Sequence, residues 1–321
     1  MSTLLLDEPE TVSSLNVHSA NQLRSTMAAA RVCFTWFGTR KSLNTEQKAQ
    51  AAESFGAQGQ YLTAGKKLID SSHPAFKAVT AIRGRILNHW KGVSLPFPEP
   101  GLRLIRQTDV ADFDRHMTSF RMELEAAVAA LDEQFDELRS AARQRLGSLY
   151  NPSDYPATLR GLFGITWDFP SIEPPEYLRR LSPALFEQEC QRVSSRFNEA
   201  VVLAEEAFIG ELNRLVSHLS ERLSGNEDGK PKVFRDTAID NLRDFFSRFQ
   251  QLNIRSNADL DALVEQAQRV LSGVEPQQLR LNADRRRQVA TQLAGVQATL
   301  DGLMVDRPRR SIIRPSQRER T

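Results

Sequence analysis

The chain contains very little cysteine, with only Cys33 and Cys190 in 321 residues. Two cysteines do not make a disulfide framework, so we expect both to be small buried side chains in a reducing compartment. Residues 1–23 contain no lysine or arginine, whereas a secretory signal peptide needs a basic start. No run of about 18 uninterrupted apolar residues is present, which argues against a membrane span. These absences predict a cytoplasmic protein without a membrane partner.

The residue spacings that carry most enzyme chemistry are also missing. The five histidines never fall in a metal-ligand pattern, and there is no C-x-x-C pair. Asp112 and His116 lie four residues apart on one predicted helix, where a surface charge pair is much commoner than a catalytic couple. The segment Gly59–Lys67 is similar to a phosphate-binding loop, but five residues separate its glycines and Lys67 replaces the Mg²⁺-binding hydroxyl. We therefore expect no enzyme activity, no cofactor and no metal site.

Charge is distributed unevenly, although the whole chain carries a net charge of only +2. Residues 24–107 hold thirteen Lys and Arg against four Asp and Glu, and residues 108–225 hold twelve against twenty. Residues 307–321 are basic again, with six Arg and one Glu. The basic parts can therefore pair with the acidic middle of the chain, or they can face a polyanion.

Apolar periodicity predicts a mainly α-helical protein. Apolar residues recur in steps of three and four over Val110–Leu149, and again over Phe186–Leu223 after a helix start at Ser182. Because the two stripes are nearly equal in length, we expect them to pack as a long antiparallel, coiled-coil-like hairpin. The connector at residues 150–182 is rich in proline and aromatic residues. We expect it to form a packed cap at the hairpin tip, with a short strand over Ile165–Phe169.

The predicted hairpin, residues 108–225, separates two smaller parts. Residues 19–107 are expected to form a small basic α+β head, and residues 226–306 a C-terminal helical bundle. Residues 1–18 and 307–321 are expected to be disordered tails. The elements expected within the head are a helix over Ala20–Ala30, a strand over Arg31–Phe37, a helix over Thr45–Ser54, a short strand over Gln60–Thr63, a helix over Pro74–Lys91 and a strand over Leu102–Arg106. The helices expected in the bundle are Val233–Leu252, Ala258–Leu271 and Ala283–Leu303.

Cations and aromatic rings alternate along the predicted head, which is the composition of a single-stranded nucleic-acid groove. Cations would contact phosphates and rings would stack on bases. The competing interpretation is that the rings form the core and the cations face water or the acidic hairpin. The candidate nucleic-acid-binding residues are Trp36, Arg40, Lys41, Lys66, Lys67, Arg83, Arg85, Trp90 and Lys91.

Three short segments resemble an uncharacterised family of bacterial, phage and plasmid helical proteins. They are Thr35–Lys41, Ala64–Asp70 and Val93–Phe97, the last of which precedes a long helix. The genes of that family are often found near those of a MoxR-type AAA+ ATPase and a von Willebrand A-domain protein. The resemblance covers roughly residues 30–220. It implies an accessory role beside such partners and supplies no catalytic residues.

The patterns favour a non-enzymatic interaction or adaptor protein that acts in a multi-protein complex, with an AAA+ ATPase or a von Willebrand A-domain protein as the partner that the resemblance implies. A homo-oligomer is compatible with the same stripes. The alternative is a protein that binds single-stranded DNA or RNA through its basic head and its arginine-rich tail.

Overall fold

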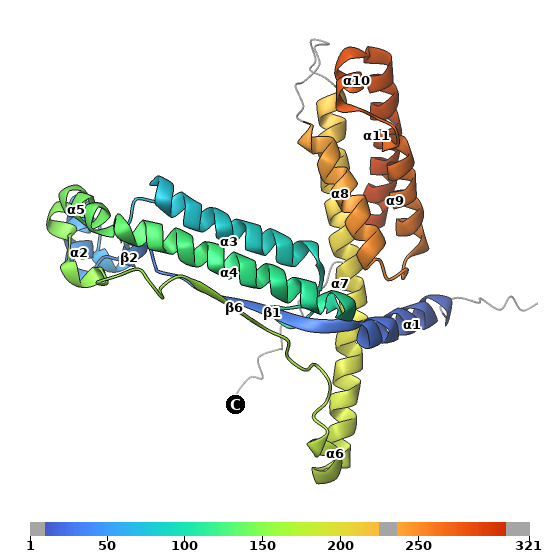
Figure 1. Ribbon diagram of the computed structural model, residues 1–321, viewed down its shortest axis with the longest axis horizontal. Helices are drawn as coiled ribbons and strands as arrows, with labels where there is room; N and C mark the ends of the chain where they lie inside the picture. Colours follow the sequence, from blue (N-terminus) through green and yellow to red (C-terminus); the bar gives the residue numbers. More distant parts are fainter. Residues whose placement is uncertain (1–9, 225–235, 306–321) are drawn as a thin grey trace, which may run out of the picture. The chain divides into compact units, whose positions relative to one another are not determined.

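The computed structural model describes residues 10–224 and 236–305, and it is mainly helical with a small sheet (Figure 1). The chain divides into two compact units. Residues 26–95 and 99–173 form one, called here the sheet unit, and residues 1–25, 96–98 and 174–321 form the other, called the helical unit. This division differs from the predicted one, because residues 108–173 belong with the sheet and not with the second long helix.

The sheet is built around one long central strand. Its order is β4-β5-β1-β6, and β1 is antiparallel to both β5 and β6. The first half of β1 pairs with β5 and the second half with β6, with Arg31 opposite both Leu102 and Asp168. The bounds of the strands are β1 (Met27–Thr35), β4 (Ser94–Pro96), β5 (Leu102–Arg106) and β6 (Gly164–Asp168).

The start of β1 corrects the predicted helix over Ala20–Ala30. Helix α1 covers Glu10–Thr26, and the chain becomes extended at Met27. Three successive alanines favour a helix intrinsically, but here their backbone is paired with β5, and tertiary pairing outweighs propensity. Residues 10–18, expected to be disordered, lie in α1; residues 1–9 of that predicted tail lie outside the described residues.

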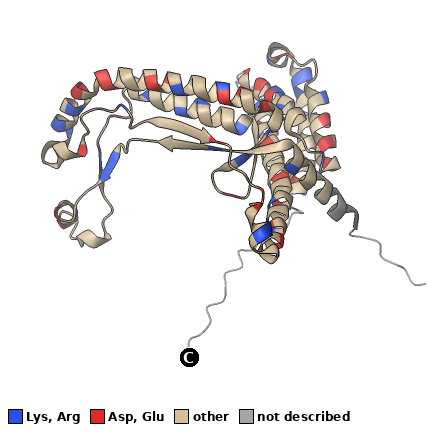
Figure 2. Ribbon diagram, turned by 60° about the horizontal axis from the view of Figure 1, so that its bottom comes forward, with Lys and Arg blue, Asp and Glu red and all other residues tan. Residues whose placement is uncertain are grey.

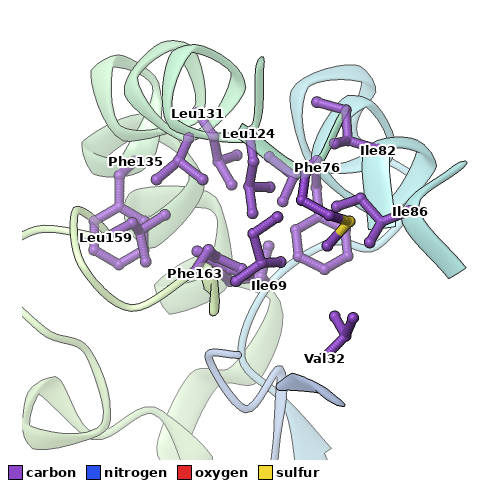
Figure 3. Close-up of a cluster of buried hydrophobic side chains, with 14 of the residues drawn as sticks. Val32, Ile69, Phe76, Ile82, Ile86, Leu124, Leu131, Phe135, Leu159 and Phe163 are labelled. Atoms are coloured by element: carbon purple, nitrogen blue, oxygen red, sulfur yellow. The ribbon is translucent and has the colours of Figure 1, made fainter. Parts of the chain in front are cut away.

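Two helices, α3 (Pro74–Gly92) and α4 (Val110–Glu133), lie side by side and α4 packs against β6 (Figure 1). The predicted start of α3 at a first-turn proline and the exact strand over Leu102–Arg106 are both confirmed. The apolar stripe of α4 is buried in a cluster with side chains of α3, the sheet and the connector (Figure 3). Leu131 and Phe135 lie in this cluster beside Leu159 and Phe163 of the connector (Figure 3).

The first long helix is interrupted, although it contains neither proline nor glycine at that point. Helix α4 ends at Glu133 and α5 covers Phe135–Leu146. Near the break, the Asp132 carboxylate accepts a 2.6 Å hydrogen bond from the backbone N–H of Leu159 and a 2.8 Å bond from the Thr158 hydroxyl. The connector is thus fixed to the end of α4, where buried Phe135 begins the next helix.

A separate two-stranded ribbon carries a short helical segment between its strands. Strand β2 (Arg40–Ser42) pairs with β3 (Gly65–Lys67), and α2 (Thr45–Glu53) and the 3-10 turn η1 (Gly59–Tyr61) come between them. The predicted helix at Thr45 is confirmed, with Asn44 as its cap. The strand expected over Gln60–Thr63 is instead the η1 turn, and the strand begins later, at Gly65. We call residues 40–67 the arm.

The helical unit packs its longest helix, α7, against α8 and α11, and α9 against α11 (Figure 1). The predicted second long helix, ending near Gly225, is confirmed as α7, and the helix at Ala258 is confirmed as α9. The short helices α6 and α10 were not expected. The bounds are α6 (Tyr177–Leu181), α7 (Pro183–Ser224), α8 (Thr237–Leu252), α9 (Ala258–Leu271), α10 (Pro276–Leu281) and α11 (Ala283–Val305).

The predicted hairpin is corrected by these packing partners. The stripe of α4 is buried against α3 and the sheet unit's core, and the stripe of α7 is buried against α8 and α11. Each stripe is therefore buried within its own unit, and the expected antiparallel, coiled-coil-like pairing of the two is not confirmed. The connector contributes β6 to the sheet instead of capping a hairpin tip. The predicted tail at residues 307–321 lies outside the described residues.

Within the described residues, no helix combines the length and the apolar character that crossing a membrane requires.

Candidate functional site

Four of the nine candidate residues lie on the ribbon of the arm. Arg40 is opposite Lys67, and Lys41 is opposite Lys66. Residues directly opposite in an antiparallel pair share a face, and successive residues along a strand alternate between faces. The ribbon therefore has an inner face with Lys41 and Lys66 and an outer face with Arg40 and Lys67. Figure 2 shows where lysine and arginine lie along the chain.

Both cations of the inner face pair with one buried carboxylate. Lys41 Nζ donates a 2.6 Å hydrogen bond to Asp154 Oδ1, and Lys66 Nζ lies 2.6 Å from Asp154 Oδ2. Lys66 also donates to the carbonyl oxygen of Leu149, at 2.6 Å. The side chains of Lys66 and Asp154 are only 5% and 2% exposed. Hydrogen bonds from Lys41 and Lys66 lower the pKa of Asp154, and the group fastens the ribbon to the connector.

The outer face has no such partner. Arg40 and Lys67 are both exposed, and neither makes an ion pair within the part of the chain that the structure describes. Like charges directly opposite on neighbouring strands repel each other. The ribbon therefore presents an uncompensated pair of cations to solvent.

Trp36 and Arg83 form a stack at the edge of the sheet unit's core. The guanidinium carbon of Arg83 lies 4.7 Å from the Trp36 ring centroid and 5.2 Å from that of Phe34. The Trp36 ring meets Phe163 edge-on, at 4.9 Å between centroids. Both Trp36 and Arg83 are half-buried. This candidate cation and this candidate ring therefore form a cation–π contact with each other.

The remaining three candidates lie on α3. Arg85 forms an ion pair with Glu123 and its guanidinium lies 5.6 Å from the Phe120 ring centroid. Trp90 is a core residue, only 8% exposed. Lys91 is exposed near the end of the helix and has no ion pair within the described ranges.

Three other cations of the predicted head have partners within the sheet unit. Arg31 makes a two-point contact with Asp168, at 2.9 and 2.5 Å. Arg106 pairs with Asp109 at 2.7 Å. Arg103 donates to the hydroxyl and the carbonyl of Ser94. Several cations of the basic head are therefore paired internally, whereas on the outer face of the ribbon two cations without ion pairs in the described ranges lie directly opposite each other.

A shallow cleft of about 180 Å³ lies next to Lys67. Arg145 of α5 reaches across it to Asp70, with 2.8 Å between Nη1 and Oδ2. Hydrogen bonds from the Ser72 hydroxyl and backbone N–H, and then from Arg145, hold the pKa of Asp70 well below its usual range. The floor is apolar, with Leu68, Ile69, Leu138, Ala142 and Leu146. The cleft can receive an apolar or planar group beside two cations.

Two aromatic rings of the arm stand in solvent. The exposed fraction is 81% for Phe55 and 82% for Tyr61. Phe55 lies just after α2 and Tyr61 ends η1. Neither Phe55 nor Tyr61 is among the nine candidate residues. The position of Phe55 between the helix end and Gly56, outside any apolar period, is the pattern that could have revealed it.

A second exposed apolar surface lies in the helical unit, on α6 and the first turns of α7. Tyr177, Leu181 and Leu185 are 62%, 77% and 51% exposed. The first buried residue of α7 is Val193, so the start of that helix lies outside the unit's core. The predicted stripe began at Phe186 and missed these three residues. Their four-residue spacing is the sequence pattern that could have identified them.

A cleft of about 570 Å³ lies between α8 and α9. Its lining is mixed, with Gln250 and Gln268 beside Asp261 and Glu265. Arg255 at its edge has a φ of 52°, the left-handed region that non-glycine residues seldom adopt. The Asn253 side chain accepts from the Arg255 backbone N–H and donates to Asp261, which accounts for this conformation locally.

Among the described residues, the histidines and cysteines do not combine with other side chains into a reactive group. The ring centroids of His89 and His116 lie 4.7 Å apart. The pKa of His89 is lowered mainly by its burial and further by the charge of the nearby His116. His116 Nδ1 is hydrogen-bonded to the backbone oxygen of Asp112, whose carboxylate pairs with Arg115. Cys33 is exposed and Cys190 is half-buried, so the expectation that both are buried is wrong. In β1 the Val32 side chain faces the core, and the next residue, Cys33, lies on the opposite face. No cluster of three metal-ligating side chains is found among the described residues.

Compared with known proteins, the chain matches no family model, no curated protein and no solved structure.

Proposed function

We propose that this protein is a non-enzymatic adaptor that works in a multi-protein complex and binds its partner through α6 and the start of α7. The observation that carries this proposal is the exposed set Tyr177, Leu181 and Leu185. We call these three residues the apolar docking surface.

The apolar docking surface has the properties of an uncovered interface. Its three side chains come from nine consecutive residues and stand on two helices that contact each other. Burying a leucine fully is worth about 1.5–3 kcal/mol, so a partner that covers these residues gains a substantial driving force. Concentrated apolar exposure on a soluble protein commonly marks an interaction site.

The charges around this surface favour a partner with an apolar segment and acidic edges. Arg179 lies 4.7 Å from the ring centroid of Phe186 and pairs with Glu176, whereas the neighbouring Arg180 is exposed without an ion pair in the described ranges. A MoxR-type AAA+ ATPase or a von Willebrand A-domain protein is the partner class that the family resemblance suggests. Of the two, we propose the ATPase first.

The test is direct binding between purified proteins. The full chain is immobilised and a MoxR-type ATPase or a von Willebrand A-domain protein is applied, with biolayer interferometry as the readout. We expect Leu181→Ser with Leu185→Ser to weaken binding at least tenfold, because each substitution removes apolar area from the contact. Leu281→Ser is the matched control: Leu281 is 88% exposed, lies in the same unit and is outside the docking surface.

Equal binding by the double variant and by Leu281→Ser would show that the partner uses another surface. Sedimentation velocity then distinguishes a hetero-complex from a homodimer. A mass that doubles with concentration, and does so only while Leu181 and Leu185 are present, would assign the surface to a homodimer and contradict the hetero-complex.

A further inference from the structure

We propose that the arm, residues 40–67, binds single-stranded nucleic acid, with phosphates on the outer face of the ribbon and bases on the exposed rings. The proposal concerns the sheet unit and does not depend on the adaptor function. Of the nine candidate nucleic-acid-binding residues it retains Arg40 and Lys67. It adds the exposed rings of Phe55 and Tyr61.

The first step is the separation of the ribbon's cations into two pairs. Asp154 pairs with both inner lysines, and the buried Lys66 also donates to the carbonyl oxygen of Leu149. These cations therefore act in folding. The inner contact also fixes the strand register that sets Arg40 opposite Lys67.

The second step is the unrelieved charge of the outer pair. Both strands are only three residues long, and a two-stranded ribbon is marginal by itself in water. A repulsive cross-strand pair is an added cost in such an element. An anion bound between Arg40 and Lys67 converts that repulsion into two attractive contacts, so the free site is already arranged for a phosphate.

The third step is the presence of exposed rings within the arm and of an apolar cleft beside Lys67. Phe55 and Tyr61 belong to the chain between the two strands of the ribbon, and more than four-fifths of each side chain is exposed. Lys67 also lines the cleft whose floor contains Leu138 and Leu146. A base can stack on an exposed ring or lie on this floor while its phosphate stays at the ribbon.

The rings decide the class of partner. An acidic peptide would satisfy Arg40 and Lys67, but it does not bring a stacking ring with every charge, as a nucleotide does. Every nucleobase has a π-face, and base–aromatic stacking contributes to binding regardless of sequence. Unpaired strands are required, because the bases of a duplex are already stacked on each other.

The experiment measures fluorescence anisotropy of labelled 30-mers of oligo-dT and oligo-U with the full chain over a salt series. We expect binding that weakens as salt rises. Arg40→Glu with Lys67→Glu should lower affinity at least tenfold and reduce the slope of log K against log salt by about 1.4, since each single-strand phosphate contact contributes about 0.7. Tyr61→Ala should lower affinity roughly five- to 150-fold, the effect of one lost stack.

The matched control is Lys77→Glu with Lys91→Glu, which changes the charge equally at two exposed positions of α3. Any contribution from the arginine-rich residues 307–321 is common to all variants and cancels in the comparison. Arg40→Glu alone separates binding from folding: it creates an attractive pair with Lys67, so the melting temperature should stay equal or rise while affinity falls.

Three results would overturn the proposal. One is no binding at low salt, and another is an equal loss in the α3 control. The third is displacement of the labelled oligonucleotide by poly-glutamate of matched charge as effectively as by unlabelled oligo-dT. That result would assign the outer face to an acidic protein segment instead.

Discussion

At the scale of single residues, the strongest electrostatic feature is the lysine pair that shares Asp154. A buried carboxylate and ammonium are stable only when each keeps a partner, because neither has water to replace it. Lys66 has two such partners and Lys41 has one. Sequence reasoning identified both lysines as cations of the head but could not find Asp154, which lies more than eighty residues later in the chain.

Removing that carboxylate should destabilise the sheet unit. We expect Asp154→Asn to lower the free energy of unfolding by about 3–5 kcal/mol, because it leaves the Lys66 charge buried without a counter-ion. Urea denaturation followed by circular dichroism measures the change. Asp168→Asn is the control, since its ion pair with Arg31 is exposed and should matter little. Similar losses in both variants would contradict the role given to burial.

The His89 imidazole provides a pH-dependent prediction. Burial and the neighbouring His116 lower the pKa of His89 from its ordinary value near 6.5. Between the lowered folded value and 6.5 the unfolded chain binds more protons, so stability decreases as pH falls below about 6.5. Unfolding free energies measured from pH 7.5 to 5 should show this decrease, and His89→Leu should flatten it. An unchanged slope in His89→Leu would assign the dependence to other groups.

At the scale of elements, the apolar stripes located the helices but not their partners. The period of α4 shows which face is buried, and it is equally consistent with cover from α7 or from α3 and a sheet. The ends were predictable where local chemistry sets them, as at Pro74, Ser182 and Leu102. The ends of helices and strands were missed where tertiary pairing sets them, as at the alanines of β1. Burial of alternate residues likewise placed Cys33 on the face opposite Val32.

Two phenylalanines allow the packing of the elements to be tested. Phe135 begins α5 and is 2% exposed, whereas Phe55 follows α2 and is 81% exposed. We expect Phe135→Ala to cost about 3–5 kcal/mol through lost burial and the cavity left behind. Phe55→Ala should leave unfolding nearly unchanged and act only on binding. Thermal and urea unfolding of the two variants measure this difference. A stability loss of similar size in both would show that the arm buries Phe55.

At the scale of the whole molecule, the two units present different surfaces. The helical unit has an apolar docking surface on α6 and α7, and the sheet unit has the cationic outer face and exposed rings of its arm. The uneven charge of the sequence indicated a basic region near the start of the chain. It could not show that Arg31, Lys41, Lys66, Arg85 and Arg106 are paired internally, since their partners Asp109, Glu123, Asp154 and Asp168 come from later segments.

Hydrogen–deuterium exchange of the full chain, alone and with the MoxR-type ATPase, tests the adaptor proposal most directly. Covering Tyr177, Leu181 and Leu185 should slow exchange of the amides from about residue 177 to residue 192, while α9 and α11 stay unchanged. The account predicts that this protection disappears in Leu181→Ser with Leu185→Ser and persists in Leu281→Ser. Protection confined to other segments, or protection that survives the double variant, would contradict it.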